Sequence, residues 1–307
     1  MKKIMFALAL ATILLVATAS LAFANGGPHG GFTATTDACA SCHRAHTAIF
    51  GRLLMVNPAT LCLSCHGAAG SGANTNVESG IYLSTRDDAP GGNWNHGAAN
   101  TPDNSALLAG RFVGTTSAHT INGTSIGAWG DGVNRGVQGA AMVMECVSCH
   151  DPHGNTNYRI INAAINGVPV AVAQVDEGAA KDYDTEQWGA GQSNVCAACH
   201  ANYHRTALGQ GSTADAGTYT HRVDMAWNGP LPAGVTVGVN NPETVGYSAA
   251  PGDEVPLAAG GIVVCQTCHL QHGITATMTA LASGPNTADS ALLRLNNRGV
   301  CQACHQK

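Results

Sequence analysis

The stretch Cys39-Ala40-Ser41-Cys42-His43-Arg44-Ala45-His46 decides how this chain folds, because its spacing recurs along the sequence. All 12 cysteines fall into six CxxCH units, and no cysteine is left over. Disulfides, zinc knuckles and redox dithiols also use paired cysteines, but none of them needs a histidine directly after every second cysteine. The cysteine pairs are Cys39 and Cys42, Cys62 and Cys65, Cys146 and Cys149, Cys196 and Cys199, Cys265 and Cys268, and Cys301 and Cys304, and they are followed by His43, His66, His150, His200, His269 and His305.

Covalent attachment of haem c accounts for this spacing. Two thiols three residues apart can add to the two vinyl groups on one haem edge, and the next residue places an imidazole beneath the iron. The sequence therefore predicts six covalently attached haems, with the twelve cysteines as attachment sites and the six motif histidines as proximal iron ligands.

The six units are of two alternating types. The first, third and fifth continue as CxxCHxxH, which adds His46, His153 and His272, whereas the second, fourth and sixth have no histidine at that offset. This alternation groups the units into pairs at residues 39–66, 146–200 and 265–305.

The paired units resemble the doubled-CxxCH multihaem cytochrome family, in which the extra histidine ligates the second haem of its pair. The resemblance implies that His46, His153 and His272 are distal ligands of the haems of His66, His200 and His305. It also implies that histidines downstream of a pair return to the first haem of that pair: His119 to the haem of His43, and His221 to that of His150. His96 and His204 compete for these roles.

The third pair ends at the C-terminus, while His29 precedes the first pair on a glycine-rich arm. This arrangement resembles the six-haem extracellular cytochrome filaments of metal-respiring bacteria, and it implies that His29 ligates the haem of His269 in a neighbouring subunit. A head-to-tail contact gives an open filament when the rotation between subunits does not close into a ring. The alternatives are that His29 lies on a disordered tail or ligates the first haem of its own chain.

The ends and the charge of the chain indicate where it works. Residues 1–24 have two lysines, an apolar stretch and Ala22-Phe23-Ala24, as a signal peptide does, so we expect residues 25–307 to be exported as one haem-threaded domain. A retained membrane anchor is the alternative, and no later segment is apolar enough to span a bilayer. A formal net charge of −5 argues against nucleic acid as a partner. The expected location is extracellular or at the cell surface.

The fold expected is a multihaem cytochrome c that is mostly loop, with short helices at the motifs and haems forming the core. With only 5% aromatic residues and 38 glycines, a large side-chain core is not expected. Asn166-Gly167 between two apolar runs predicts a small β-hairpin. Residues 288–295 predict one or two helical turns before Cys301.

These features favour electron transfer over catalysis. An enzyme of the multihaem nitrite or hydroxylamine type needs an exchangeable iron position, yet all six motifs are CxxCH and eight further histidines are present to saturate the irons. Electrons would pass to partner cytochromes or external acceptors, either along a homopolymer or from a monomeric carrier.

Overall fold

The computed structural model describes the segments that carry all six CxxCH motifs, while the predicted signal peptide, residues 1–24, lies outside the described residues. In the part of the chain described, no helix is long and apolar enough to cross a membrane. The described residues are 29, 36–67, 75–77, 81–82, 88–89, 93–94, 117–121, 123–129, 138–175, 187–188, 191–204, 220–227, 235–237, 244–247, 254–258, 260–273, 291–295 and 299–305.

The helices are short and most of them contain or adjoin a CxxCH motif. Among the helices in the described residues, α2 is the longest at nine residues. Its N-cap is Asn57, whose side chain accepts a hydrogen bond from the Thr60 amide, and Pro58 follows at the first helical position. The helical segments are η1 (Thr36–Ser41), η2 (Gly51–Leu53), α2 (Pro58–His66), α3 (Cys146–Cys149), η3 (Tyr158–Ile160), α4 (Gln192–Ala197), η4 (Ala201–Tyr203), α5 (Cys265–Cys268) and α7 (Gly299–Gln302).

The strands pair in small antiparallel sheets between the motifs. They are β1 (Thr75–Asn76) with β2 (Ile81–Tyr82), β3 (Asp88–Ala89) with β4 (Asn93–Trp94), β5 (Ser125–Trp129) with β6 (Gln138–Val143), β7 (Ala164–Ile165) with β8 (Val168–Pro169), β9 (Gln174–Val175) with β10 (Gln187–Trp188), β11 (Met225–Ala226) with β15 (Ile262–Val263), and β12 (Val235–Val237) with β13 (Thr244–Tyr247) and β14 (Glu254–Pro256). The expectation of a mostly irregular chain with short helices at the motifs is confirmed, and hairpins are more numerous than the one expected.

The hairpin predicted at Asn166-Gly167 is present between β7 and β8. Both turn residues have positive φ, 50° and 74°, as a two-residue turn of this kind requires. Pro169 pairs with Ala164, and the flanking bond runs from the Val170 amide to the Ala163 carbonyl. Proline therefore occupies a position where the ladder needs no donor.

The helix predicted over residues 288–295 is wrong for the part that the structure describes. Residues 291–295 form a turn in which Ala291 and Leu292 have positive φ, and Leu293 bridges to His269. Helix α7 begins only at Gly299. The segment instead forms a turn that pairs with a motif histidine.

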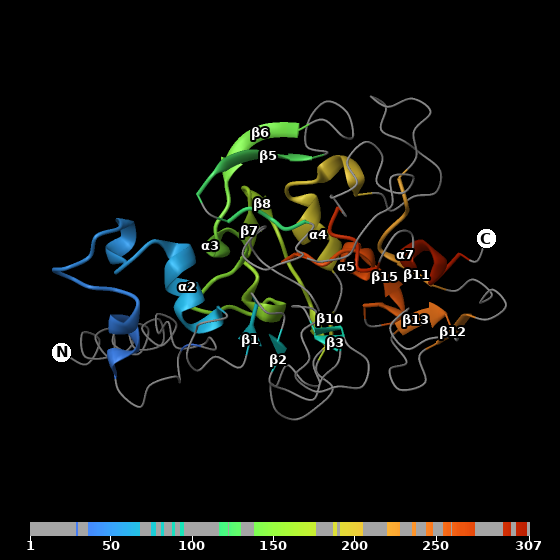
Figure 1. Cartoon of the computed structure of the whole chain (residues 1–307), viewed down its shortest axis with the longest axis horizontal. Coiled ribbons are helices and arrows are strands. Elements are labelled where there is room, and N and C mark those ends of the chain that lie inside the picture. The colour runs from blue at the N-terminus through green and yellow to red at the C-terminus, as the bar shows by residue number, and fades with distance from the viewer. Residues whose placement is uncertain are drawn as a thin grey trace, which may run out of the picture.

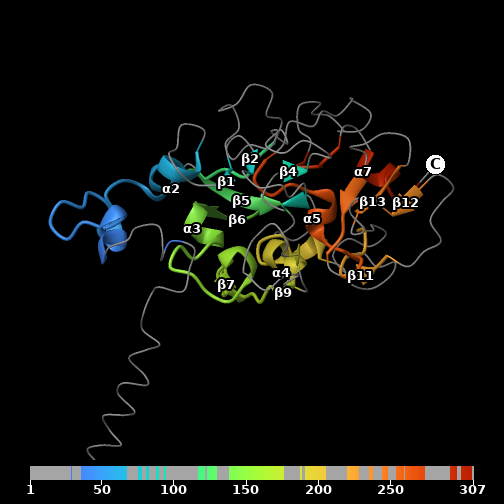
Figure 2. The ribbon, with the colours of Figure 1, turned by 90° about the horizontal axis from the view of Figure 1, so that it is seen from below.

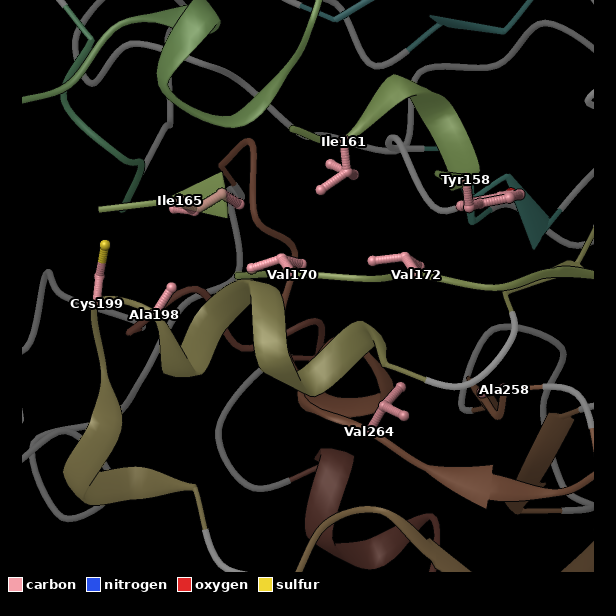
Figure 3. Close-up of a cluster of buried hydrophobic side chains, with 9 residues drawn as sticks. All are labelled: Tyr158, Ile161, Ile165, Val170, Val172, Ala198, Cys199, Ala258 and Val264. Carbon is pink, nitrogen blue, oxygen red and sulfur yellow. The ribbon is translucent and has the colours of Figure 1, made fainter. Parts of the chain in front are cut away.

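The largest apolar cluster lies between the β7–β8 hairpin and α4 (Figure 3). Tyr158 is its bulkiest member and is 1% exposed. The Asn157 side chain holds this region together: its amide nitrogen donates to the carbonyls of Ile161, Asn162 and Val170, and its oxygen accepts from the Val172 amide. The cluster consists of Tyr158, Ile161, Ile165, Val170, Val172, Ala198, Cys199, Ala258 and Val264.

The motif-bearing helices follow one another along the long axis of the molecule in chain order. Figures 1 and 2 show α2, α3, α4, α5 and α7 in this order, from the blue end of the ribbon to the red end. Helix α2 contacts α3, and α4 contacts α5. The Gln266 amide nitrogen of α5 donates to the Gln192 side-chain oxygen of α4 at 3.1 Å. The chain therefore lays its motifs out as a row.

Candidate haem-binding sites

Each CxxCH unit ends in a helical turn closed on the motif histidine. The histidine amide donates to the carbonyl of the first cysteine, four residues back, with N···O distances of 2.7–3.1 Å at five of the motifs. The sixth, His66, closes α2. The turn brings both thiols and the imidazole to one end of a short helix, as the attachment chemistry requires.

The twelve motif cysteines differ in exposure. Cys65 is exposed, and it lies in α2, a helix with no buried residue. Its Sγ accepts a hydrogen bond from the Ser64 hydroxyl at 3.9 Å. The exposed cysteines are Cys39, Cys65 and Cys301.

A second segment supports each of the three CxxCHxxH units in the same way. The motif histidine bridges to a residue of a downstream turn, in the pairs His43–Leu54, His150–Ile161 and His269–Leu293. The amide after the histidine donates to a carbonyl of that turn, and the amide after the bridging residue donates back to the second cysteine's carbonyl. These bonds are Arg44–Leu53, Asp151–Ile160 and Leu270–Leu292, and Met55–Cys42, Asn162–Cys149 and Arg294–Cys268.

The same turns fix the orientation of the imidazoles. Nδ1 donates to the first left-handed residue's carbonyl oxygen: His43 to Arg52 at 2.8 Å, His150 to Arg159 at 3.0 Å and His269 to Ala291 at 2.8 Å. Because a carbonyl only accepts, Nδ1 carries the proton and Nε2 keeps its lone pair for a metal.

These turns are strained at residues that rarely adopt positive φ. Arg159 and Ile160 have φ of 53° and 51°, and Arg52 and Leu53 both have φ of 59°. A left-handed conformation costs an L-residue about 1–2 kcal/mol. All three supporting turns have this left-handed conformation, which directs a backbone carbonyl toward the imidazole of the motif histidine.

Five of the six motif histidines face another histidine ring within the chain. The ring centroids lie 6.0–6.2 Å apart. Two imidazoles bonded to opposite faces of one metal ion, each at about 2 Å, have centroids about 6 Å apart. The pairs are His66–His29, His43–His153, His200–His119, His150–His272 and His305–His221.

The opposing histidines come from the expected set, but every pairing differs from the one that the resemblance implied. The motif row explains the difference: each CxxCHxxH unit lies beside the preceding one, so its last histidine reaches that unit. His153 thus faces His43 rather than His200, and His272 faces His150 rather than His305.

The other ring contacts also differ from the expected pairings. His119 faces His200 rather than His43, and His221 faces His305 rather than His150. His29 faces His66 of its own chain, not His269 of a neighbour.

Two further histidines remain to be placed. His204 Nε2 donates to an Asp224 carboxylate oxygen at 2.7 Å. His96 lies outside the described residues. Among the residues that the structure describes, no histidine ring faces His269, and His46 faces no motif histidine; His46 is exposed.

The opposing histidines of the even units are held by the next CxxCHxxH unit. Nδ1 of His29 donates to the Pro152 carbonyl at 2.9 Å, and Nδ1 of His119 donates to the Gln271 carbonyl at 2.6 Å. Both acceptors are the residue just before the last histidine of a CxxCHxxH unit. His221 instead donates to its own neighbour, the Arg222 carbonyl, at 2.7 Å.

Burial keeps several of these rings neutral. Burial lowers the pKa of His119, His150 and His269 from the usual value of the imidazole. A neutral imidazole has the free lone pair that an iron needs.

The thiols of successive motifs lie beside one another. The Cys62 and Cys146 side chains are hydrogen-bonded, which raises the pKa of Cys62 and lowers that of Cys146. The same contact between Cys196 and Cys265 raises the pKa of Cys196 and lowers that of Cys265 to about 7.

Burial dominates at the other junctions and raises the pKa of Cys42, of Cys149 to about 11 and of Cys268 to about 12, with a smaller contribution from the neighbouring thiols of the next motif. Every consecutive pair of motifs is thus joined by neighbouring thiols. The three remaining junctions bring together Cys42 with Cys62 and Cys65, Cys149 with Cys199, and Cys268 with Cys301 and Cys304.

Sequence reasoning missed the supporting turns. A signal was present in the first two units, where Arg52-Leu53-Leu54 and Arg159-Ile160-Ile161 both begin nine residues after the motif histidine. The third copy, Ala291-Leu292-Leu293, is separated from His269 by a longer connection.

Comparisons with known proteins match one segment of the sequence to a family model and find one similar solved structure. Residues 29–71 match the family model of the doubled CXXCH motif. An outer membrane cytochrome S filament from Geobacter sulfurreducens superimposes with a TM-score of 0.44 at 15% identity, over 88% of this chain and 98% of that chain. No curated protein matches the sequence. The histidine pairs, the thiol pairs and the matched motif fit haem c, and residues 29–71 carry the doubled CXXCH motif.

Proposed function

We propose that this chain is an exported hexahaem c-type cytochrome that polymerises head to tail into an extracellular filament and carries electrons to partner cytochromes or external acceptors. The observation that carries the proposal is the row of histidine pairs: five motif histidines face a partner ring in the chain, and the sixth, His269, faces none among the described residues.

The role in electron transfer follows from how the chain would hold its haems. When bound, haem supplies the iron that is alternately oxidised and reduced. The chain would supply a histidine on both faces of five irons, and a neighbouring copy would complete the sixth. Ligation by two histidines leaves no position for a substrate and sets the lower range of potentials. Neighbouring thiols at each motif junction keep successive attachment sites adjacent. Conduction along the row is therefore favoured over catalysis.

The case for a filament is that no histidine of the described residues faces His269. Within the chain, His153 of the second CxxCHxxH unit faces the motif histidine of the first unit. His272 of the third unit faces the motif histidine of the second. The third unit would need the same histidine from a fourth unit. His46 is the corresponding histidine of the first unit, so we propose that His46 of a neighbouring copy ligates the haem of His269.

This assignment replaces His29 as the intersubunit ligand. His29 is engaged with His66 of its own chain, whereas His46 is exposed on the segment at the blue end of the molecule (Figure 1). The unit that holds His269 lies nearer the red end. Two different surfaces that join end to end make a heterologous contact, which propagates as a filament when its rotation does not close.

Electron microscopy of the secreted wild-type protein tests the polymer, and intact mass with optical spectroscopy tests the haems. We expect filaments, six covalent haems per chain and a wholly low-spin spectrum. A protein that stays monomeric at all concentrations would instead be a diffusing carrier, and readily cyanide-binding high-spin haem in the polymer would indicate an enzyme.

A further inference from the structure

The junctions between CxxCHxxH units inside the chain share one design. At each, the later unit places its last histidine against the preceding unit's motif histidine. It also offers the carbonyl just before that histidine to an imidazole from the even unit between them: the Pro152 carbonyl to His29, and the Gln271 carbonyl to His119. Ligand and carbonyl acceptor therefore come from the same short segment.

The last even unit has an imidazole that does not follow this design. His221 faces His305 as His29 faces His66, yet its Nδ1 donates to the adjacent Arg222 carbonyl rather than to a later unit. The position of the missing acceptor in a fourth unit corresponds to Ala45, which lies just before His46. Ala45 is exposed, whereas Pro152 and Gln271 are half-buried.

The first unit also exposes apolar surface around its supporting turn. Leu53 is 53% exposed, while its counterparts Ile160 and Leu292 are half-buried. Ile49 and Phe50, just before the turn, are 72% and 44% exposed. These three exposed apolar side chains, called the patch below, lie on the same short segment as the exposed Ala45 and His46.

We infer that this patch is the subunit contact, and that it repeats the internal junctions. The segment 45–53 of one copy docks on the last motif pair of the next, the Ala45 carbonyl accepts a hydrogen bond from the neighbouring copy's His221 Nδ1, and Ile49, Phe50 and Leu53 become buried. The inference rests on the proposed head-to-tail polymer and names the surface that builds it. It makes His221 exchange its local acceptor for one on another subunit.

The apolar part is tested with the double variant Ile49→Ser/Phe50→Ser. Both side chains are exposed in the chain, so folding should be unaffected. Burying a large apolar side chain contributes about 1.5–3 kcal/mol, so losing two should raise the critical concentration for assembly by roughly a hundredfold or more. The matched control is Val143→Ser/Val168→Ser, at positions that are 50% and 44% exposed but outside the segment.

Sedimentation across a concentration series, with electron microscopy, measures the effect. The control should assemble as the wild type does, and the Ile49/Phe50 variant should remain soluble with its haems attached. Equal critical concentrations for the two variants would overturn the patch while leaving a polymerising wild type, and thus the proposed function, intact. A wild type that never assembles would overturn both.

The hydrogen bond is tested in the assembled polymer. A cryo-electron microscopy map should place the His221 Nδ1 within hydrogen-bonding distance of the neighbouring copy's Ala45 carbonyl oxygen. A map in which His221 still donates to Arg222, or in which Ala45 faces solvent, would contradict it even if the filament itself is present.

Discussion

Replacing His46 by Ala should remove one iron ligand and the subunit link together. The five histidine pairs within the chain do not involve His46, so five haems should stay low-spin and one in six should become high-spin. All six should remain attached, because the variant changes no CxxCH motif. Optical and electron paramagnetic resonance spectra of the purified variant measure the high-spin fraction.

The loss of assembly in this variant follows from the energies at the interface. The three apolar side chains that the contact buries, Ile49, Phe50 and Leu53, contribute about 5–9 kcal/mol in all. Association costs about 4–15 kcal/mol in lost freedom of motion. Without the coordinate bond the contact is therefore too weak to form filaments at micromolar concentration, and sedimentation should find soluble protein.

Added imidazole separates the two roles of His46. Free imidazole should restore a low-spin spectrum to the variant without restoring filaments, because it ligates the iron but joins no subunit. His204→Ala is the matched control, since His204 is engaged with Asp224 and should change neither spectrum nor assembly. A His46→Ala protein with a wholly low-spin spectrum and filaments of normal length would refute the assignment.

Three other variants test the rest of the row. His29→Ala should give one high-spin haem but leave filaments, because His29 faces His66 of its own chain; loss of filaments with His29 alone would restore it as the subunit link. Asn157→Ala should destabilise the protein by about 3 kcal/mol, since it removes the side-chain donor of the Asn162 and Val170 carbonyls and the acceptor of the Val172 amide, while the Ile161 carbonyl keeps Asn155; a chemical-denaturation midpoint equal to the wild type would contradict this. Ala291→Gly should stabilise by about 0.5–1 kcal/mol at its φ of 51°, as measured by thermal unfolding, and a loss of stability would show that the turn is not strained there.

The sequence predicted the chemistry of the motifs better than their partners. The CxxCH spacing and the Asn166-Gly167 pair are local signals. The helical turns at the motifs and the β7–β8 hairpin could therefore be predicted directly from the sequence. The set of opposing histidines could also be named. Which motif each one faces depends on the path of long connections, and a histidine at a fixed offset can reach either its own pair or the preceding unit.

The supporting turns could not be predicted from their local sequence. The sequence predicts a helical turn over residues 288–295, yet Ala291 and Leu292 are left-handed because their carbonyls accept hydrogen bonds from the His269 imidazole and the Leu270 amide. Such tertiary demands override local propensity, and no property of the isolated segment reports them.

The agreement between motif order along the chain and motif order in space has a consequence for how such molecules change in evolution. Because each described junction joins consecutive units, a duplicated pair of motifs inserted between two existing pairs would find the same neighbours on both sides. Repeat proteins with nearest-neighbour contacts lengthen in this way. A gene duplication would thus extend the row by two haems without redesigning either end, and the number of haems per chain becomes a quantity that can grow while the subunit joint stays the same.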